Sequence, residues 1–176
     1  MPSQQVQALL PSEEYLFGKC DAVLVHYTTP SGINSEFCSL QSHFSFFTSY
    51  FTAAVVAQVR AIFNFSSRGH PLPPEHSYLL LYVQYFTFSA TPTDQPEVRM
   101  YTACHMFVDN PDGGRSHVGA IISLLDVIHT VELIPKYGTA VNREVMSATC
   151  LELYNEFYLN NFSDKEWHHT VHKDYL

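Results

Sequence analysis

The residue types best suited to metal chemistry lie near the end of the chain, in "WHHTVHKD" at 167–174. His168 and His172 are four residues apart, which on a helix would place both imidazoles on one face, as in many zinc sites. The glutamate of the HExxH pattern is missing, and no third ligand can be assigned. We therefore favour an exposed tail over 166–176 and keep a metal site at His168 and His172 as the alternative.

Two other pairs of residues could support catalysis. Cys104 precedes His105 in "TACHMF", but neighbours in a strand point to opposite faces, so another histidine would have to activate the thiol. We favour a buried thiol. Asp109 and Asp112 in "DNPDGG" could approach one divalent cation, yet they are better explained as turn formers.

Motifs for nucleotide binding and for a nucleophile elbow are missing from the sequence. Nothing in it resembles GxxxxGK[ST], GxGxxG or GxSxG. We therefore expect no cofactor and a non-enzymatic protein. A metal-dependent or cysteine-based enzyme is the alternative.

Aromatic residues gather in "YLLLYVQYFTF" at 78–88. Tyr78, Tyr82 and Phe86 share one face of a strand, and Tyr85 lies on the other. Clustered rings can hold a methylated ammonium or stack on a peptide, but they also fill cores. The sequence predicts a binding surface at Tyr82, Tyr85 and Phe86, for a protein or, alternatively, a small ligand or carbohydrate.

The elements that would position these residues are mostly strands. Alternating or β-branched patterns predict strands at 21–27, 55–65, 78–88, 98–108, 118–123 and 129–134, with a helical turn at "SLLDVI" and a tight turn at "DNPDGG". In the strand at 55–65, Gln58 and Arg60 are expected on a polar, exposed face. The apolar spacing over 144–169 predicts a C-terminal helix.

An uncharged stretch at 37–59 carries six aromatic rings. Its Ser, Thr and Gln residues argue against a membrane span. Spacings of three and four predict an amphipathic helix inserted at 34–54, with a ring-bearing loop as the alternative. Its rings, Phe37, Phe44, Phe47 and Phe51, could mediate self-association.

The composition is that of one globular domain. The chain has 176 residues, 46% hydrophobic and 15% charged, with a net charge of −8 that disfavours direct nucleic-acid binding. Four cysteines without CxxC spacing, and no secretory leader, favour an intracellular protein. We expect a loosely held arm at 1–14, one domain at 15–165 and the tail at 166–176.

These elements predict a mainly β, α+β fold. Long irregular loops and the lack of strand–helix alternation disfavour a doubly wound parallel sheet. We expect a small, partly open antiparallel β-barrel with a C-terminal helix and one inserted helix.

The order of segments resembles the C-terminal region of fungal (basidiomycete) transposase-like proteins of the Plavaka and Kyakuja-Dileera-Zisupton type. The pieces that carry this resemblance are "AQVRAIF", "VELIPKYG" and "NEFYLN". The succession of "VLV", "AQVRAIF" and "VQYF" strands also resembles a bromo-adjacent homology barrel of chromatin proteins. Together they imply an intracellular protein-interaction module, in the nucleus or outside it, that is associated with a transposable element and with chromatin.

Overall fold

A computed structural model describes the strand-rich part of the chain. The described residues are 5–13, 15, 18–26, 54–64, 79–140, 143, 145–146 and 148–160. Apart from Ala54, the predicted inserted helix at 34–54 lies outside them, as do the tail at 166–176 and its histidines His168 and His172.

Strands dominate these residues, which confirms the mainly β prediction. In chain order the elements are β1 (Ala8–Leu9), β2 (Lys19–Cys20), β3 (Ala22–His26), β4 (Ala54–Phe63), β5 (Leu80–Ala90), β6 (Tyr101–His105), β7 (Phe107–Asp109), β8 (Arg115–His117), β9 (Gly119–Ser123), the 3₁₀ turn η2 (Leu124–Asp126), β10 (Val127–Val131), β11 (Leu133–Pro135), α2 (Cys150–Leu153) and β12 (Glu156–Leu159).

The three strands predicted at 21–27, 55–65 and 78–88 are present as β3, β4 and β5. They pair antiparallel in that order, as their β-branched and aromatic residues favour. The register of β4 against β5 shifts after Val59, so Arg60 occupies a bulge. A bulge bends its strand and turns a side chain to a new direction.

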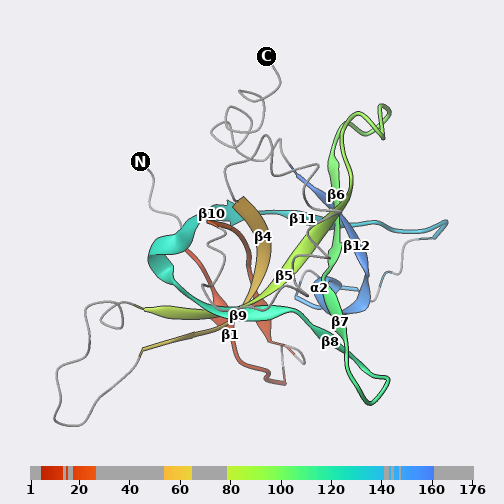
Figure 1. Cartoon of the computed structure of the whole chain (residues 1–176). Helices are drawn as coiled ribbons and strands as arrows, with labels where there is room; N and C mark the ends of the chain where they lie inside the picture. The colour runs from red at the N-terminus through yellow and green to blue at the C-terminus, as the bar shows by residue number, and fades with distance from the viewer. Residues whose placement is uncertain are drawn as a thin grey trace, which may run out of the picture.

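Seven strands form a nearly closed antiparallel barrel (Figure 1). Their order is β10-β3-β4-β5-β6-β12-β11. Only Glu132 separates β10 from β11, so the first and last strands of this order are consecutive in the chain. The remaining strand of the sheet, β9, pairs with the first half of β5, whereas β6 pairs with the second half.

Buried side chains line both faces of β3, β4 and β5. One cluster draws on most of the barrel strands and on α2, and it fills the barrel: Ala22, Leu24, Val56, Phe86, Tyr101, Ala103, Leu133, Cys150, Leu151, Phe157 and Leu159. The second cluster lies on the opposite face of the same three strands: Val23, Val25, Val55, Ala57, Val59, Leu81 and Val83. Partly buried residues of the N-terminal segment, β9, η2 and β10 pack over this second cluster.

The predicted C-terminal helix is wrong for the described residues. Only the single turn α2 is helical there, and Tyr154 returns to an extended backbone before β12 begins. β12 pairs with β6 on one edge and β11 on the other, and Phe157 and Leu159 are fully buried. A short helix gains little stability by itself, whereas a strand paired on both edges is stabilised by its neighbours. The segment is therefore extended despite the helical spacing of its apolar residues. Within the part of the chain that the structure describes, no helix could span a membrane.

The predicted turns are confirmed. "DNPDGG" connects β7 to β8 in a ribbon that projects from the barrel (Figure 1), with Gly113 at a φ of 83°, in the region that favours glycine. The predicted helical turn is η2. Ser123 and Asp126 close its start with a capping box, in which the Asp126 carboxylate accepts from the Ser123 backbone N–H.

Candidate functional site

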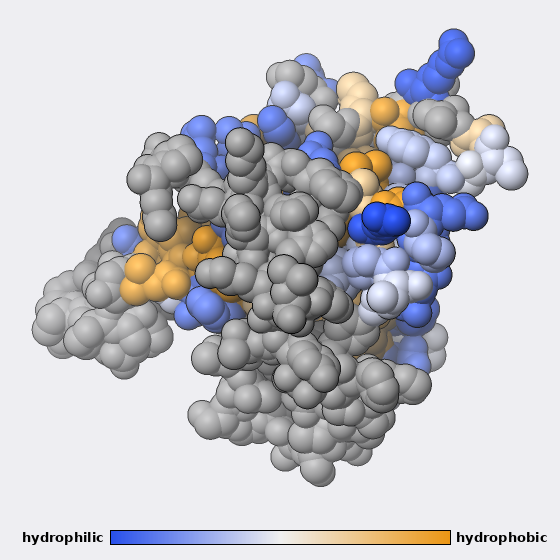
Figure 2. Space-filling view, turned by 90° about the horizontal axis from the view of Figure 1, so that it is seen from above, coloured by the Kyte–Doolittle hydropathy of each residue, from blue (hydrophilic) through white to orange (hydrophobic). Residues whose placement is uncertain are grey.

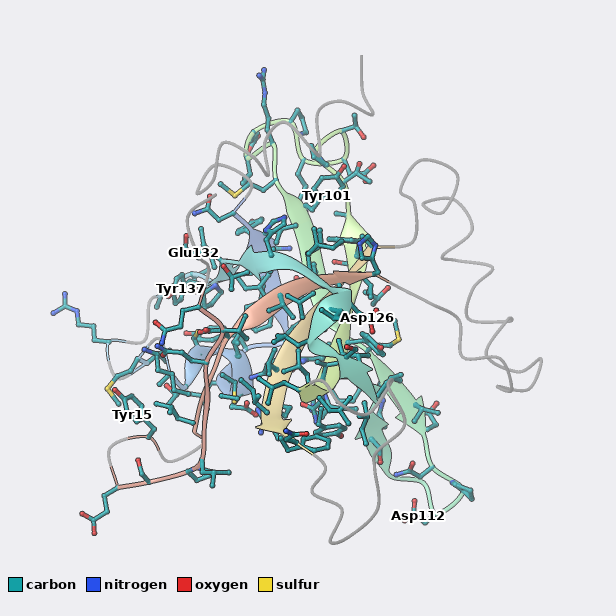
Figure 3. All side chains as sticks on the ribbon, turned by 90° about the vertical axis from the view of Figure 1, so that its left-hand side faces the viewer. Tyr15, Tyr101, Asp112, Asp126, Glu132 and Tyr137 are labelled. Atoms are coloured by element: carbon teal, nitrogen blue, oxygen red, sulfur yellow. The ribbon has the colours of Figure 1, made fainter. Side chains whose placement is uncertain are left out.

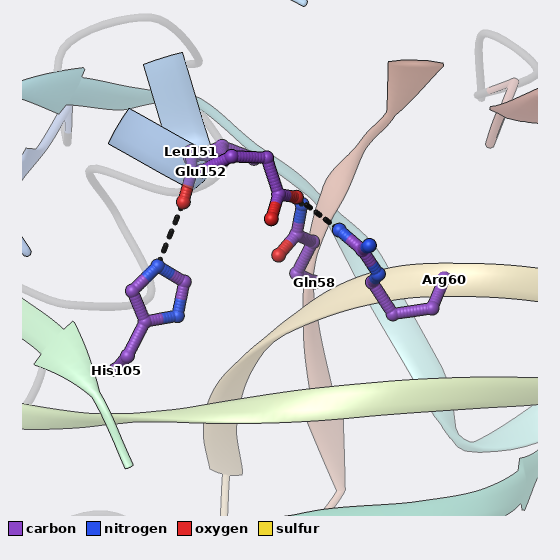
Figure 4. Close-up of polar contacts among 5 residues, drawn as sticks. All are labelled: Gln58, Arg60, His105, Leu151 and Glu152. Atoms are coloured by element: carbon purple, nitrogen blue, oxygen red, sulfur yellow. Dashed lines mark hydrogen bonds and ion pairs between the residues drawn. The ribbon is translucent and has the colours of Figure 1, made fainter. Parts of the chain in front are cut away.

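The strongest polar cluster of the described residues fastens α2 to the barrel. Glu152 of α2 forms an ion pair with Arg60, the bulge residue of β4 (Figure 4). The same carboxylate oxygen accepts from Gln58 Nε2 at 3.1 Å. The expectation that Gln58 lies on an exposed face is wrong, because α2 covers it: the residue is 2% exposed.

His105 makes the second polar contact to α2, from a site among aromatic rings. Its Nε2 lies 2.8 Å from the Leu151 carbonyl oxygen, and its ring centroid is 4.5 Å from that of Phe86 and 5.6 Å from that of Phe157. Because a carbonyl oxygen only accepts, Nε2 carries the proton and Nδ1 is an acceptor. Burial lowers the pKa of His105, so its imidazole is neutral at pH 7.

His117 lies edge-on to His105, with ring centroids 4.9 Å apart. Burial also lowers the pKa of His117. For both imidazoles the Glu152 carboxylate raises the pKa and the Arg60 guanidinium lowers it. Among the described residues, three buried atoms here have no hydrogen-bond partner: Gln58 Oε1, His105 Nδ1 and His117 Nδ1. The hydrogen bond from His105 to the Leu151 carbonyl therefore fastens α2 to the barrel, and within the described part of the chain the two Nδ1 atoms remain unpaired.

The thiol predicted as an alternative nucleophile lies on the other face of β6. Cys104 is partly exposed and stands opposite Glu156 of β12, whereas His105 faces the barrel interior. Burial and the nearby Glu156 carboxylate raise the pKa of the Cys104 thiol. The thiol is therefore protonated at pH 7, which disfavours nucleophilic chemistry.

The two turn carboxylates act as turn formers. Asp109 pairs with Arg115 across the β7–β8 ribbon at 3.3 Å, and Asp112 Oδ1 accepts from the Gly114 backbone N–H. Asp112 lies at the tip of the ribbon (Figure 3). Across the described ranges, no group of three or more His, Cys, Asp or Glu residues could hold a metal ion.

The three rings predicted as a binding surface do not share one face. Phe86 is 1% exposed and fills the barrel between His105 and Phe157. Tyr85 is partly buried against the second core cluster. Tyr82 is the exposed member of the three, at 38%.

Tyr82 belongs to an apolar row that crosses three strands. It pairs with Ala61 of β4 on one side and with Ile121 of β9 on the other, and Ile121 is 59% exposed. Paired residues of adjacent strands point to the same face, so Ala61, Tyr82 and Ile121 form one apolar row. Orange, hydrophobic atoms reach the surface between hydrophilic ones in the space-filling view (Figure 2).

The Tyr82 side chain lies beside Gly119. A Cβ added at Gly119 would lie 3.2 Å from the Tyr82 ring and 2.6 Å from the Val83 carbonyl oxygen. Ile121 was not predicted as a site residue, because the apolar run at 117–135 gives no polar alternation that marks an exposed position. Its exposure could have been found only from the strand register.

Comparison with known proteins adds no relative: no protein-family model, curated protein or solved structure matches the chain. The nearly closed antiparallel barrel therefore rests on the geometry described above.

Proposed function

We propose that the chain is a protein-interaction module that binds a partner through the apolar row Ala61, Tyr82 and Ile121. The observation that carries this proposal is the side-by-side exposure of Tyr82 and Ile121 on a sheet face. Exposed apolar side chains that adjoin one another are typical of binding surfaces, and tyrosine is enriched where partners meet.

The barrel supplies a rigid support for this row. Behind it, Leu81 and Val83 of β5 are fully buried, so the strand that carries Tyr82 is held by a packed core. Side chains on such strands lose little further freedom on binding, which favours affinity. The fastening of α2 to β4 by Glu152 holds the bulge beside the row.

The biological setting in this proposal comes from the sequence resemblances alone. A nearly closed antiparallel barrel agrees with the architecture that the bromo-adjacent homology resemblance implies. On that basis we propose an intracellular partner, and an association with chromatin and with a fungal transposable element.

Replacing an apolar side chain of the row by a neutral polar one tests the interaction. Ile121→Gln places an amide where a partner would exclude water, so we expect at least a tenfold loss of affinity. Val108→Gln is the matched control, since Val108 is also exposed, at 42%, but lies on the projecting ribbon.

The measurement is fluorescence anisotropy with labelled basic peptides, including modified and unmodified histone tails. Equal affinities for wild type, Ile121→Gln and Val108→Gln would rule out the apolar row as the binding surface. Binding of other basic peptides but of no histone peptide would remove chromatin from the proposal.

A further inference from the structure

The hydrogen-bond pattern between β5 and β9 fixes which backbone groups of β9 are used. The Tyr85 N–H donates to the Val118 carbonyl at 2.9 Å, and the Leu124 N–H donates to the Leu79 carbonyl at 2.9 Å. These two pairs lie just beyond the two ends of the paired stretch of β5 and β9. In an antiparallel ladder hydrogen-bonded and non-hydrogen-bonded pairs alternate, so every second pair from either end is hydrogen-bonded.

Gly119 and Ile121 fall at the non-hydrogen-bonded positions, opposite Gln84 and Tyr82. Their N–H and C=O groups therefore point away from β5. Among the described strands, β9 pairs with β5 alone, so no described strand pairs with the outward-facing backbone groups of Gly119 and Ile121. Both residues are exposed. β9 thus offers two N–H donors and two C=O acceptors along an open edge.

This edge lacks the usual protection against pairing. Edge strands in natural proteins commonly carry charged residues, proline or bulges that hinder pairing with another chain. β9 reads "GAIIS", with neither charge nor proline, and its register with β5 is continuous. The capping box uses the Ser123 N–H, which limits the open edge to the stretch before it.

We propose that β9 binds an extended, basic segment of a partner protein as an added strand. This inference rests on the proposed function and specifies its mode: the added strand pairs with Gly119 and Ile121, and an apolar side chain contacts the apolar row. Strand addition draws affinity from backbone hydrogen bonds and specificity from alternate side chains.

The net charge of the chain favours a basic partner segment at β9. A net charge of −8 attracts basic peptides, speeds their association and repels a second copy of the chain. The occupant is therefore a partner segment with lysine or arginine alternating with apolar residues, rather than another β9.

Proline at position 121 tests the backbone contribution. Ile121→Pro removes an N–H that the fold does not use, as edge strands tolerate, whereas Ile121→Ala truncates the side chain and keeps the N–H. The probe is a blocked heptapeptide that alternates lysine and valine. We expect Ile121→Pro to bind it about tenfold more weakly than Ile121→Ala does. In wild type, the peptide should slow hydrogen exchange at the Gly119 and Ile121 amides.

A second probe covers the case in which Ile121→Pro does not fold, as judged by circular dichroism. The same peptide, N-methylated at alternate residues on the face that pairs, should lose binding to wild type. Equal binding by Ile121→Pro and Ile121→Ala, or by both peptides, would overturn strand addition. It would leave the proposed function standing if Ile121→Gln still weakens binding.

Two further outcomes would overturn the inference. One is no binding of the unmodified peptide by wild type. The other is concentration-dependent dimerisation in sedimentation that Ile121→Pro abolishes, which would identify a second copy as the occupant.

Discussion

Single residues decide how closely β9 approaches β5. At Gly119 the absence of a Cβ leaves room for the Val83 carbonyl oxygen and for the Tyr82 ring. An aromatic ring over a glycine in a neighbouring strand compensates for the missing side chain. Tyr82, the tyrosine of the apolar row, therefore also has a structural contact.

Substitution of this glycine tests the close approach. Gly119→Ala would place a Cβ 2.6 Å from the Val83 carbonyl oxygen, so β9 must shift. We expect a loss of about 1–3 kcal/mol in the free energy of unfolding, measured by urea denaturation. Gly138→Ala is the control, because nothing lies within 4 Å of its added Cβ. Equal stability of the two variants would contradict the close approach.

At the scale of elements, α2 depends on contacts with the barrel more than on its own helical bonds. It is a single turn, and the Thr149 side chain does not cap it. Its two buried residues, Cys150 and Leu151, pack into the barrel, while Glu152 and the Leu151 carbonyl make the polar contacts. One turn of this kind is held by packing and by partners on other strands.

Glu152→Gln tests the polar part of this attachment. The variant loses the charge that Arg60 pairs with, yet a side-chain oxygen remains to accept from Gln58. Because the paired side chains are about a quarter exposed, we expect a loss of stability of less than about 1 kcal/mol.

The local effect should be larger than the global one. Hydrogen exchange of the Tyr154 N–H, which bonds to the Cys150 carbonyl across α2, should accelerate more than exchange in β4. Glu97→Gln, at an exposed site outside α2, is the control. Equal acceleration throughout the sheet would show that α2 does not open separately.

For the whole molecule, the buried histidines link stability to pH. Burial lowers the pKa of both His105 and His117 below the ordinary 6.5, with Arg60 acting in the same direction and Glu152 opposing it. Between the ordinary value and the lowered value, the unfolded chain binds more protons than the folded one. This contribution to stability is thus complete above pH 6.5 and is lost as the pH falls through the lowered pKa.

Urea denaturation between pH 7.5 and pH 5 measures this dependence. Wild type should lose stability on acidification, and His105→Gln should lose less, because one of the two groups no longer titrates. His26→Gln, at an exposed position on β3, should keep the wild-type slope. A wild-type slope in His105→Gln would contradict the role of His105.

Much of the fold follows from local patterns. β-branched and aromatic runs determined the strands at β3, β4 and β5, because their side chains favour the extended backbone wherever they are buried. Gly and Asp determined the β7–β8 turn, and Ser123 with Asp126 determined η2, since caps and turns depend on neighbours in the chain. These features could be predicted without any distant contact.

The remaining features depended on which segments meet in space. β12 is a strand because β6 and β11 bind both of its edges, which its helical spacing cannot reveal. Gln58 is buried because α2, distant in sequence, covers it, and Phe86 is buried because the barrel closes around it. The candidate site likewise depends on register: only the pairing of β5 with β9 places Ile121 beside Tyr82 and leaves one edge of β9 open. The sequence determined local conformation, whereas tertiary packing decided which faces and edges remain available for binding.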